Sequence, residues 1–589
     1  MNSFEILKAK DGNDTLVYKN ESKKYFLHSS YYPDKEAKEW ADAIEINDES
    51  ILIIYGVGLG YHINYLLSKL SPNNRLILVE PSNEIFQFAL NNGYYERFKN
   101  RENLYFISEE SEEKLNVILQ TYIPWDNFEN VVYKEFKQYP NVFGEYYERF
   151  NKCLIETINS MRINRNTALY FAEQWQSNFM ENLEFVFRSA AVKSFFNLFK
   201  NIPAVIVSAG PSLDKNIEQL KEVKGKCVII CVGTALKALL QKKIEPDFVV
   251  SIDGGEKNFE HFDGCKINSP LVYDLTLYPK ILKEYEGPLI IAEIASTYTK
   301  LLSDKLSLDF GKLSTGPSVA NLSLDFAYML GCNPIIFIGQ DLAYLDNRTH
   351  ASGTTYEKDR IKENSDEKEY IYVDGNYEEK VLTDRVLLSF KTWFENYIYG
   401  HQDRIYINAT EGGALIKRTK IMRFKEAIEL FMKREINIKE EINSALKKGE
   451  IRLDKRQINA FTKEFEDAIK KLEKIKNDCM RGAKLSKKMY NEYQKDVNAD
   501  VSHITSILDK IDKRLKNSKD SFVYISSILN IVTTKVLKGF NPEKDETKKQ
   551  KKLRIAMMSY TLYQGIYEAI EKSEDGLRKA LKTVDEIKQ

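Results

Sequence analysis

Short apolar runs, each followed by an amphipathic stretch, mark the first structured part of the chain, at about residues 45–135. Residues 51–55 and 75–80 predict buried strands. Residues 61–70 and 82–91 predict the helices that follow those strands. This alternation predicts a βαβ unit, in which parallel strands are joined by right-handed crossovers.

The same pattern returns between Pro203 and about Lys420. Several of its apolar runs are continuous in Val and Ile, which is typical of strands buried on both faces of a sheet. The predicted strands are residues 204–208, 227–232, 248–253, 271–273, 289–293, 335–339 and 405–408. We interpret the polar residues 345–377 as a long loop over the carboxyl edge of this sheet.

After Lys420 the strand signals largely vanish, and amphipathic helical patterns dense in Lys and Glu take their place. The predicted helices are residues 423–447, 455–489, 498–517, 520–538 and 551–583. Gly539, Asn541 and Pro542 interrupt them. Because the heptad pattern is not sustained, we predict a helical bundle rather than a coiled coil, with its charges mainly on a solvated face.

The fold class is therefore α/β, in four segments. Residues 1–150 form an N-terminal Rossmann-like domain, and residues 151–200 form a helical connector. Residues 201–420 form a central doubly wound domain, and residues 421–589 form an all-α C-terminal helical bundle.

Composition narrows the possible partners. The 589 residues include 86 Lys and Arg against 86 Asp and Glu, so no net charge attracts a polyanion to the whole surface. We expect no nucleic-acid partner. A hydrophobic fraction of 43% suits large cores and argues against a disordered chain.

The same evidence bounds the compartment. The opening segment MNSFEILKAKDGND lacks the basic and apolar regions of a secretory signal. The longest apolar runs, such as residues 334–339, fall far short of the roughly 18 residues that a membrane-spanning helix needs. The six cysteines show neither zinc-site nor redox-pair spacing. We expect a soluble, reduced, cytoplasmic protein without a membrane span.

The first candidate site is a glycine turn, Gly56, Gly58 and Gly60, directly after a predicted strand, with Glu80 at the end of the next strand. Such a turn approaches a nucleoside closely, and the acid can hold ribose hydroxyls. It resembles the turn of class I methyltransferases, but Ile54 stands where those enzymes usually carry an acid. Both a ligand site and a scaffold without a ligand remain open.

The second candidate site is a pair of hydroxyl-rich turns, each before a predicted helix. Gly210, Pro211, Ser212 and Leu213 follow the strand at residues 204–208. Glycine permits the sharp turn, and proline is favoured at the first helical position. Exposed amides at a helix N-terminus bind anions, so the turn predicts a phosphate or nucleotide site.

The second turn, within residues 314–321, has the same arrangement of glycine and hydroxyl residues before a predicted helix. Its candidate residues are Thr315, Gly316, Ser318 and Asn321. One such turn is often only a helix cap. Two of them in one sheet favour a nucleotide site.

Acids also follow three of the predicted strands: Asp253, Asp341 (after Gly339 and Gln340) and Glu411. Acids beside buried strands are costly unless they line a cleft or are hydrogen-bonded. They could bind sugar hydroxyls, a ribose or a divalent cation.

His350 lies nine residues after Asp341 on the polar loop, where it could act as a general base near neutral pH. The other histidines show no paired spacing, which argues against a histidine metal site. The sequence contains neither a GxSxG elbow nor a P-loop.

Taken together, these motifs resemble those of the Maf (motility-associated factor) flagellin glycosyltransferases. They are VSAGPSLDKNI, VGTALKALL, VSIDGG, STGPSVANLSLDFAYMLGCNPIIFIGQDLAY, THASGT and NATEGGALI. The central domain of that family is similar to bacterial sialyltransferases. A weaker similarity, through GPSL and IDG, extends to archaeal-type 6-hydroxymethylpterin pyrophosphokinases.

The resemblance implies a cytoplasmic enzyme that transfers a nonulosonic acid of the pseudaminic or legionaminic type. The donor would be its CMP ester, and the acceptor would be a Ser or Thr of flagellin. The helical C-terminal region would recognise flagellin. The resemblance implies no required cofactor and no metal, with Mg²⁺ left open.

The resemblance also assigns expected roles. The CMP phosphate would lie at the amides of Gly210, Ser212 and Leu213, with hydroxyls from Ser212, Thr315 and Ser318. Thr234 and Asp253 would face the nucleoside or the sugar. Asp341 or Glu411 would stabilise the oxocarbenium-like transition state, and His350 would accept the acceptor proton, although either acid could serve as the base instead.

Two alternatives from other classes stay open. The chain could be a flagellin chaperone or scaffold with a vestigial nucleotide fold. It could also be a pyrophosphokinase that uses ATP and Mg²⁺.

Overall fold

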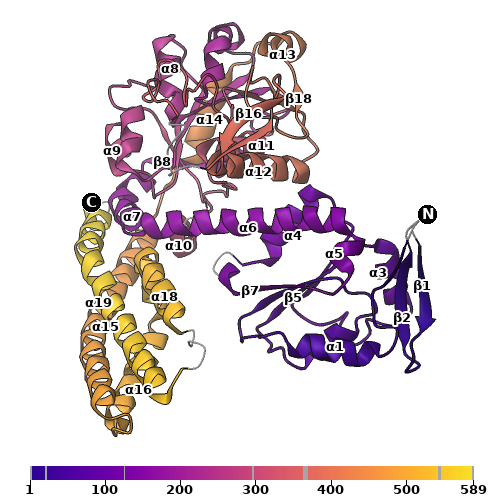
Figure 1. Cartoon of the computed structure of the whole chain (residues 1–589). Helices are drawn as coiled ribbons and strands as arrows, with labels where there is room; N and C mark the ends of the chain where they lie inside the picture. The colour runs from indigo at the N-terminus through magenta and orange to yellow at the C-terminus, as the bar shows by residue number, and fades with distance from the viewer. Residues whose placement is uncertain are drawn as a thin grey trace. The chain divides into compact units, whose positions relative to one another are not determined.

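The computed structural model describes residues 3–19, 23–124, 127–294, 297–361, 369–540 and 546–586 (Figure 1). The chain divides into two compact units, Met1–Asn166 and Thr167–Gln589, which are described separately. Within the described residues, no helix is long and apolar enough to cross a membrane.

The first unit is built on a four-stranded parallel sheet with the strand order β6-β5-β4-β7. Its strands are β4 (Ile51–Tyr55), β5 (Arg75–Glu80), β6 (Leu104–Ser108) and β7 (Val131–Glu135). The predicted βαβ unit is confirmed, because β4 and β5 are parallel and joined by a helix. Ile51, on the central strand, lies between Arg75 and Val131.

The remaining elements of this unit include an antiparallel three-stranded sheet that the sequence did not predict. Its strands are β1 (Ser3–Lys8), β2 (Asp14–Lys19) and β3 (Lys24–Phe26). The helices are α1 (Pro33–Asp42), α2 (Tyr61–Leu67), α3 (Asn83–Asn91), α4 (Glu112–Tyr122), α5 (Tyr139–Val142) and α6 (Gly144–Tyr170), the last of which runs into the second unit.

The second unit contains a nine-stranded parallel sheet with the order β18-β17-β14-β9-β10-β11-β12-β13-β8. The strands are β8 (Ser189–Ala191), β9 (Ala204–Val207), β10 (Val228–Val232), β11 (Phe248–Val250), β12 (Leu271–Tyr273), β13 (Leu289–Ile291), β14 (Ile335–Ile338), β17 (Tyr406–Asn408) and β18 (Lys420–Ile421). The seven predicted strands are confirmed, and the edge strands β8 and β18 are additional.

The strand order creates a switch point between β9 and β14. From β9 the chain builds the sheet outward through β10 to β13, and then returns to place β14 on the other side of β9. In open parallel sheets, ligands bind outside the carboxyl ends of the strands at such a point. Both predicted turns flank these two strands in sequence.

Helices cover this sheet and connect its strands. They are α7 (Ala172–Val186), α8 (Leu236–Gln241), α9 (Pro279–Glu284), α10 (Thr297–Leu306), α11 (Val319–Met329) and α12 (Arg385–Gly400). Helix α11 packs against β9, β10, β11 and β14. The helix expected after Leu213 is instead a pair of 3₁₀ turns, because the side-chain amide of Asn216 donates to the carbonyl of Ala409 and holds the chain there.

The interpretation of residues 345–377 as a loop is wrong in its last part. Strand β15 (Tyr370–Asp374) pairs antiparallel with β16 (Lys380–Asp384) in a two-stranded hairpin. Thr383 Oγ1 donates to the carbonyl of Leu342, so the hairpin is fixed beside the end of β14. The high charge of this segment concealed a strand whose Val373 packs against the core of the second unit.

The helical region comprises α13 (Phe424–Phe431), α14 (Ile438–Gly449), α15 (Lys455–Lys495), α16 (Ser502–Asn517), α17 (Lys519–Phe522), α18 (Ser526–Phe540) and α19 (Lys548–Glu586). The single helix predicted at 423–447 is wrong. It breaks before α14 because the amide of Ile436 donates to the carbonyl of Gly225. Gly539 lies within α18, and Asn541 and Pro542 lie outside the described residues.

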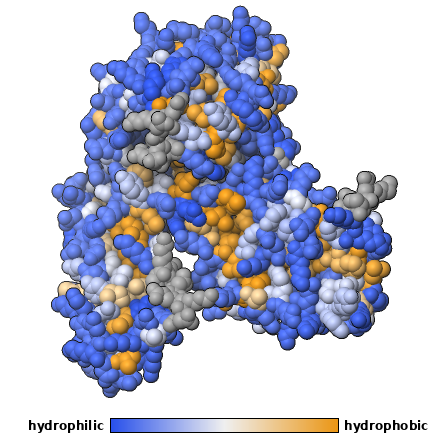
Figure 2. All heavy atoms as spheres, viewed as in Figure 1, coloured by the Kyte–Doolittle hydropathy of each residue, from blue (hydrophilic) through white to orange (hydrophobic). Residues whose placement is uncertain are grey.

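Helices α15 and α19 are antiparallel partners. Arg578, near the end of α19, pairs with Glu473 in the middle of α15, and Lys552, near the start of α19, lies over the ring of Tyr493 at the end of α15. Hydrophilic residues predominate on the visible face of this region, with apolar residues interspersed (Figure 2). Between the two ends, Gly482 lies so close to α19 that an added Cβ would approach Tyr563 Cγ to 2.8 Å.

Substituting Gly482→Val should therefore force α15 and α19 apart. The Tyr563 ring cannot swing aside without breaking its 2.7 Å hydrogen bond to Asp512. We expect a loss of roughly 1–3 kcal/mol in the free energy of unfolding, measured by denaturant titration of the helical signal. Lys484→Val, at an exposed position of the same helix, is the matched control and should change stability by less than about 1 kcal/mol. Equal effects of the two substitutions would contradict the close packing.

Candidate functional site

The glycine turn after β4 is occupied by side chains of its own domain. Gly56 has φ +97°, and a Cβ there would lie 2.4 Å from Tyr139 Cγ. A Cβ on Gly58 would lie 2.4 Å from His28 Nε2. The space in front of the turn is therefore filled by Tyr139 and His28, and this favours the scaffold interpretation.

The side chain of Glu80 also points into its own domain, where it binds the glycine turn. Its carboxylate accepts the amides of Val57 and Gly58 at 3.2 and 2.9 Å and the hydroxyl of Tyr139 at 2.9 Å. Burial raises the pKa of Glu80 to about 7, and these hydrogen bonds oppose the shift. The acid expected to hold a ribose instead caps the turn from inside.

At the switch point of the second unit, the turn after β9 is closed by Asp341. The amide of Ser212 donates to Asp341 Oδ2 at 2.9 Å, and the Ser212 hydroxyl donates to Oδ1. A Cβ on Gly210 would lie 2.6 Å from Asp341 Oδ2, so only glycine fits there.

The amides expected to hold the phosphate at this turn already have protein acceptors. The Gly210 amide donates to the carbonyl of Gly339 at 2.8 Å, and that of Leu213 donates to Gly210 at 3.0 Å. With Ser212 bound to Asp341, all three of these predicted amides are engaged. An anion at this turn would have to displace the Asp341 carboxylate.

Asp341 is fully enclosed, and its main chain is also held. Its carbonyl accepts the amide of Ala414 at 2.7 Å, and Gly413 (φ +76°) packs directly on its backbone. Burial raises the pKa of Asp341 to about 6, and the hydrogen bonds from Ser212 counteract part of this. Gln340 is also buried, where its side chain accepts the hydroxyl of Ser208 at 2.5 Å.

The second hydroxyl-rich turn is built differently. Ser318 and Asn321 form a capping box at the start of α11, and Gly316 packs against Asn321 and Trp393. Thr315 Oγ1 donates to the carbonyl of Gly316 at 3.1 Å. Because α11 leads through a short connection into β14, its N-terminus lies at the carboxyl edge of the sheet.

Backbone amides at this turn remain able to donate, whereas those of the turn after β9 are bound to protein acceptors. Among the described residues, the amides of Val319 and Ala320 have no protein acceptor. A helix N-terminus with such amides suits an anion. The two neighbouring hydroxyls already donate within the turn, Thr315 to the carbonyl of Gly316 and Ser318 to Asn321 Oδ1 at 2.9 Å.

The other predicted residues lie at the ends of separate strands. Thr234 is half-buried in the 3₁₀ turn that follows β10. Asp253 Oδ1, after β11, accepts the amide of Gly255 at 2.8 Å. The carbonyl of Glu411, after β17, accepts Lys215 Nζ at 2.6 Å, and its side chain is half-buried.

The loop that carries His350 is attached to the turn after β9. The amide of Ala351 donates to the carbonyl of Ala209 at 2.8 Å. Asp214 accepts hydrogen bonds from Arg348 and from the amide and hydroxyl of Ser352. Burial would raise the pKa of Asp214, but these bonds outweigh it and hold the pKa below its usual value.

Sequence reasoning missed two residues beside His350. These residues are Tyr356 and His261. The ring of Tyr356 lies 5.3 Å from that of His350 and 5.1 Å from the buried ring of His261. His261 is 4% exposed. Burial, then the neighbouring His350 and Lys237, lower the pKa of His261 to about 4. Tyr356 could have been found from its place in the same loop, whereas His261 is remote in sequence.

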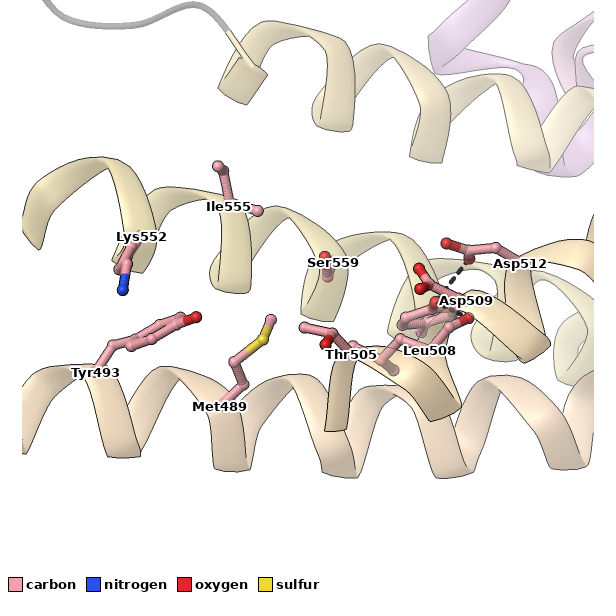
Figure 3. A pocket seen from close by; sticks show the side chains of 10 residues that line it. Met489, Tyr493, Thr505, Leu508, Asp509, Asp512, Lys552, Ile555 and Ser559 are labelled. Atoms are coloured by element: carbon pink, nitrogen blue, oxygen red, sulfur yellow. Dashed lines mark hydrogen bonds between the residues drawn. The ribbon is translucent and has the colours of Figure 1, made fainter. Parts of the chain in front are cut away.

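A pocket of about 210 Å³ lies in the helical region between α15, α16 and α19. Figure 3 shows Lys552 and Tyr493 at one end and Asp509 and Asp512 at the other. None of the predicted site residues lines it.

A parallel sheet with hydroxyl-rich turns at its switch point is typical of α/β proteins that bind nucleotides. Comparison with known proteins refines this class. Residues 6–141 match the family described as glycosyltransferase Maf N-terminal domain. Residues 177–347 match the family described as 6-hydroxymethylpterin diphosphokinase MptE-like.

The whole chain also has the fold of a solved protein, the MAf glycosyltransferase from Magnetospirillum magneticum AMB-1. The match has a TM-score of 0.52 at 16% identity and covers 99% of this chain and 92% of that one. The resemblance to the Maf family is therefore confirmed, as is a mixed α/β fold with parallel sheets.

Two uncharacterised proteins of Treponema pallidum (strain Nichols) are also similar to this chain. One is 26% identical over 245 residues, which are 40% of this chain and 50% of the relative. The other is 26% identical over 98 residues, 17% of this chain and 46% of the relative. The matched segments thus span about half the length of these curated relatives.

The raised pKa of Asp341 predicts a pH effect on stability. The folded state favours the protonated carboxyl, so its contribution is full at low pH and is lost as pH rises through about 6. Relative to Asp341→Asn, the wild type should lose on the order of 3 kcal/mol between about pH 4 and pH 7, measured by denaturant titration of the full chain.

Asp214→Asn is the matched control with the opposite sign. Because the pKa of Asp214 is lowered, the wild type should lose stability relative to this variant as pH falls. Identical pH profiles for wild type and Asp341→Asn would contradict the enclosed carboxylate.

The buried His261 provides a second pH prediction. Its ring should stay neutral until about pH 4, as followed by the ¹³Cε1 shift in histidine-labelled protein. In the urea-unfolded chain the same residue should titrate near 6.5. Its contribution to stability should therefore fall as pH drops from about 6.5 to 4. Titration near 6.5 in the folded protein would show that the ring is solvated.

Proposed function

We propose that this chain is a glycosyltransferase that moves a nonulosonic acid of the pseudaminic or legionaminic type from its CMP ester to Ser or Thr hydroxyls of flagellin. Flagellum assembly and motility would depend on this modification. The Maf family resemblance supports the reaction class and the protein acceptor. The donor, flagellin as the acceptor and the cytoplasmic location are parts of the proposal.

The observation that carries the proposal is the turn at the start of α11. Its amides at Val319 and Ala320 and its hydroxyls at Thr315 and Ser318 lie at the carboxyl edge of the sheet. We place the donor phosphate here rather than at Ser212, because the Asp341 carboxylate already occupies the Ser212 amide. Thr234 and Asp253, on neighbouring strand ends, would face the nucleoside or the sugar.

In the transfer step, the bond between the anomeric carbon and the phosphate oxygen breaks, and its electron pair leaves with CMP. The acceptor hydroxyl oxygen bonds to the anomeric carbon, and its proton passes to His350. Half-buried Glu411 would stabilise the oxocarbenium-like transition state. Asp341 suits this role less well, because its oxygens are committed to Ser212.

A second candidate is pyrophosphoryl transfer from ATP, which the match over residues 177–347 favours. It would use the same switch point and would release AMP when ATP, Mg²⁺ and a pterin alcohol are supplied. A flagellin chaperone would bind flagellin without either reaction.

The proposed reaction is tested by the mass of flagellin. Purified protein, flagellin and a CMP-nonulosonate should give flagellin with the mass of added sugar residues. His350→Gln should lower the transfer rate by about 10²–10⁴-fold, because the proton acceptor is lost. His503→Gln, at an exposed helical position, is the control and should leave transfer unchanged. Unmodified flagellin together with ATP-dependent AMP release would favour the kinase instead.

The proposed phosphate position is tested at Thr315. The Thr315 hydroxyl donates to the carbonyl of Gly316 and would turn from it to the donor phosphate. Thr315→Val removes this hydroxyl without disturbing the Ser318 cap, and should raise the KM for the donor about tenfold through loss of a hydrogen bond to a charged group. Thr561→Val, which removes a similar hydroxyl from α19, should have no effect. An unchanged donor KM would place the phosphate elsewhere.

A further inference from the structure

Tyr356 lies between two imidazole rings that come from different parts of the second unit. His350 precedes it in the same loop, with ring centroids 5.3 Å apart and an interplanar angle of 58°. His261, at the end of a 3₁₀ turn after β11, meets Tyr356 edge-on at 5.1 Å and 90°. Tyr356 is thus held by a buried ring and itself contacts the proposed base.

Both imidazoles are held by a hydrogen bond between Nδ1 and a threonine hydroxyl. His350 Nδ1 lies 2.9 Å from Thr349 Oγ1, and that hydroxyl donates to the carbonyl of Asp359. His261 Nδ1 lies 3.0 Å from Thr355 Oγ1, and that hydroxyl donates to the carbonyl of Glu260. The two threonine–carbonyl distances are 3.4 and 3.3 Å. With each threonine proton directed to its carbonyl, each Oγ1 would accept from the imidazole, so that Nδ1 would carry the proton and Nε2 the lone pair.

We propose that Tyr356 and His261 are positioning residues that hold the His350 ring in the orientation and tautomer in which Nε2 accepts a proton. This inference rests on the proposed function for the role of His350. Tyr356 restricts the ring from one side, and His261 restricts Tyr356.

The surrounding charges are compatible with that role. When His350 takes a proton it becomes a cation, and a charged His261 nearby would oppose this step. His261 is instead neutral near pH 7, because burial lowers its pKa. Lys237 also acts on His261, and the acids Glu260, Asp253 and Asp359 act on Tyr356. The aromatic ring of Tyr356 further tolerates a neighbouring cation.

The kinetic test separates the Tyr356 ring from its hydroxyl. Tyr356→Ala should lower kcat for flagellin modification about tenfold or more while the donor KM stays within about twofold, because the base is misplaced but the donor site is intact. Tyr356→Phe keeps the ring and should rescue kcat to within about threefold of wild type. Tyr372→Ala, at a 71% exposed position of β15, is the control for the substitution itself. Equal losses in the Phe and Ala variants would show that the hydroxyl acts directly, and would overturn the proposal.

A second measurement does not depend on the reaction. ¹⁵N spectra of the histidine-labelled full chain, assigned with His350→Gln and His261→Gln, should show both rings protonated at Nδ1 near neutral pH. Tyr356→Ala should turn the His350 signal into a mixture of tautomers, while Tyr356→Phe should not. An Nε2-protonated His350 in the wild type, or an unchanged tautomer in Tyr356→Ala, would overturn the positioning role. If wild-type protein fails to modify flagellin, the proposed function fails, and these spectra still decide how the ring is held.

Discussion

The hydrogen bonds between the Asp341 carboxylate and Ser212 are the interaction on which the switch point of the second unit depends. An enclosed carboxylate is costly unless its oxygens are paired, and here both oxygens accept from the turn after β9. Its main chain also holds the loop after β17 through Ala414. One residue therefore joins the ends of β9, β14 and β17. The His350 loop is attached to the same turn after β9, because the amide of Ala351 donates to the carbonyl of Ala209.

This constraint separates two turns that look alike in sequence. Gly210–Pro211–Ser212 and Gly316–Pro317–Ser318 have the same residues, and both precede helical segments. In the first, the serine amide and hydroxyl are bound to Asp341. In the second, the serine caps α11, and the next amides keep their capacity to donate. Local sequence determines that each turn forms, but the neighbouring strand determines whether it can receive an anion.

This difference between local sequence and remote contacts also explains how much of the fold and of the site could be predicted from the sequence. Continuous Val and Ile runs identify the strands of the parallel sheet, because burial on both faces leaves no room for polar alternation. The edge strand β8 was missed since Ser189–Ala191 is short and poor in β-branched residues. Asp341 was recognised as a special acid, but its partner Ser212 lies 129 residues away. The contact of His261 with Tyr356 bridges a similar distance, and no pattern of spacing indicates it.

In the first unit, too, contacts from other parts of the chain determine whether a turn can receive a ligand, and there they exclude one. Its glycine turn has the backbone of a nucleoside site, including positive φ at Gly56, Gly58 and Gly60. Yet Glu80 accepts the turn amides from within, and the rings of Tyr139 and His28 stand where a ligand would approach. A nucleoside would have to displace a buried carboxylate, a tyrosine and a histidine together. At the switch point of the second unit, the amides of Val319 and Ala320 at the start of α11 require no such displacement, and for this reason the proposed donor phosphate is placed there.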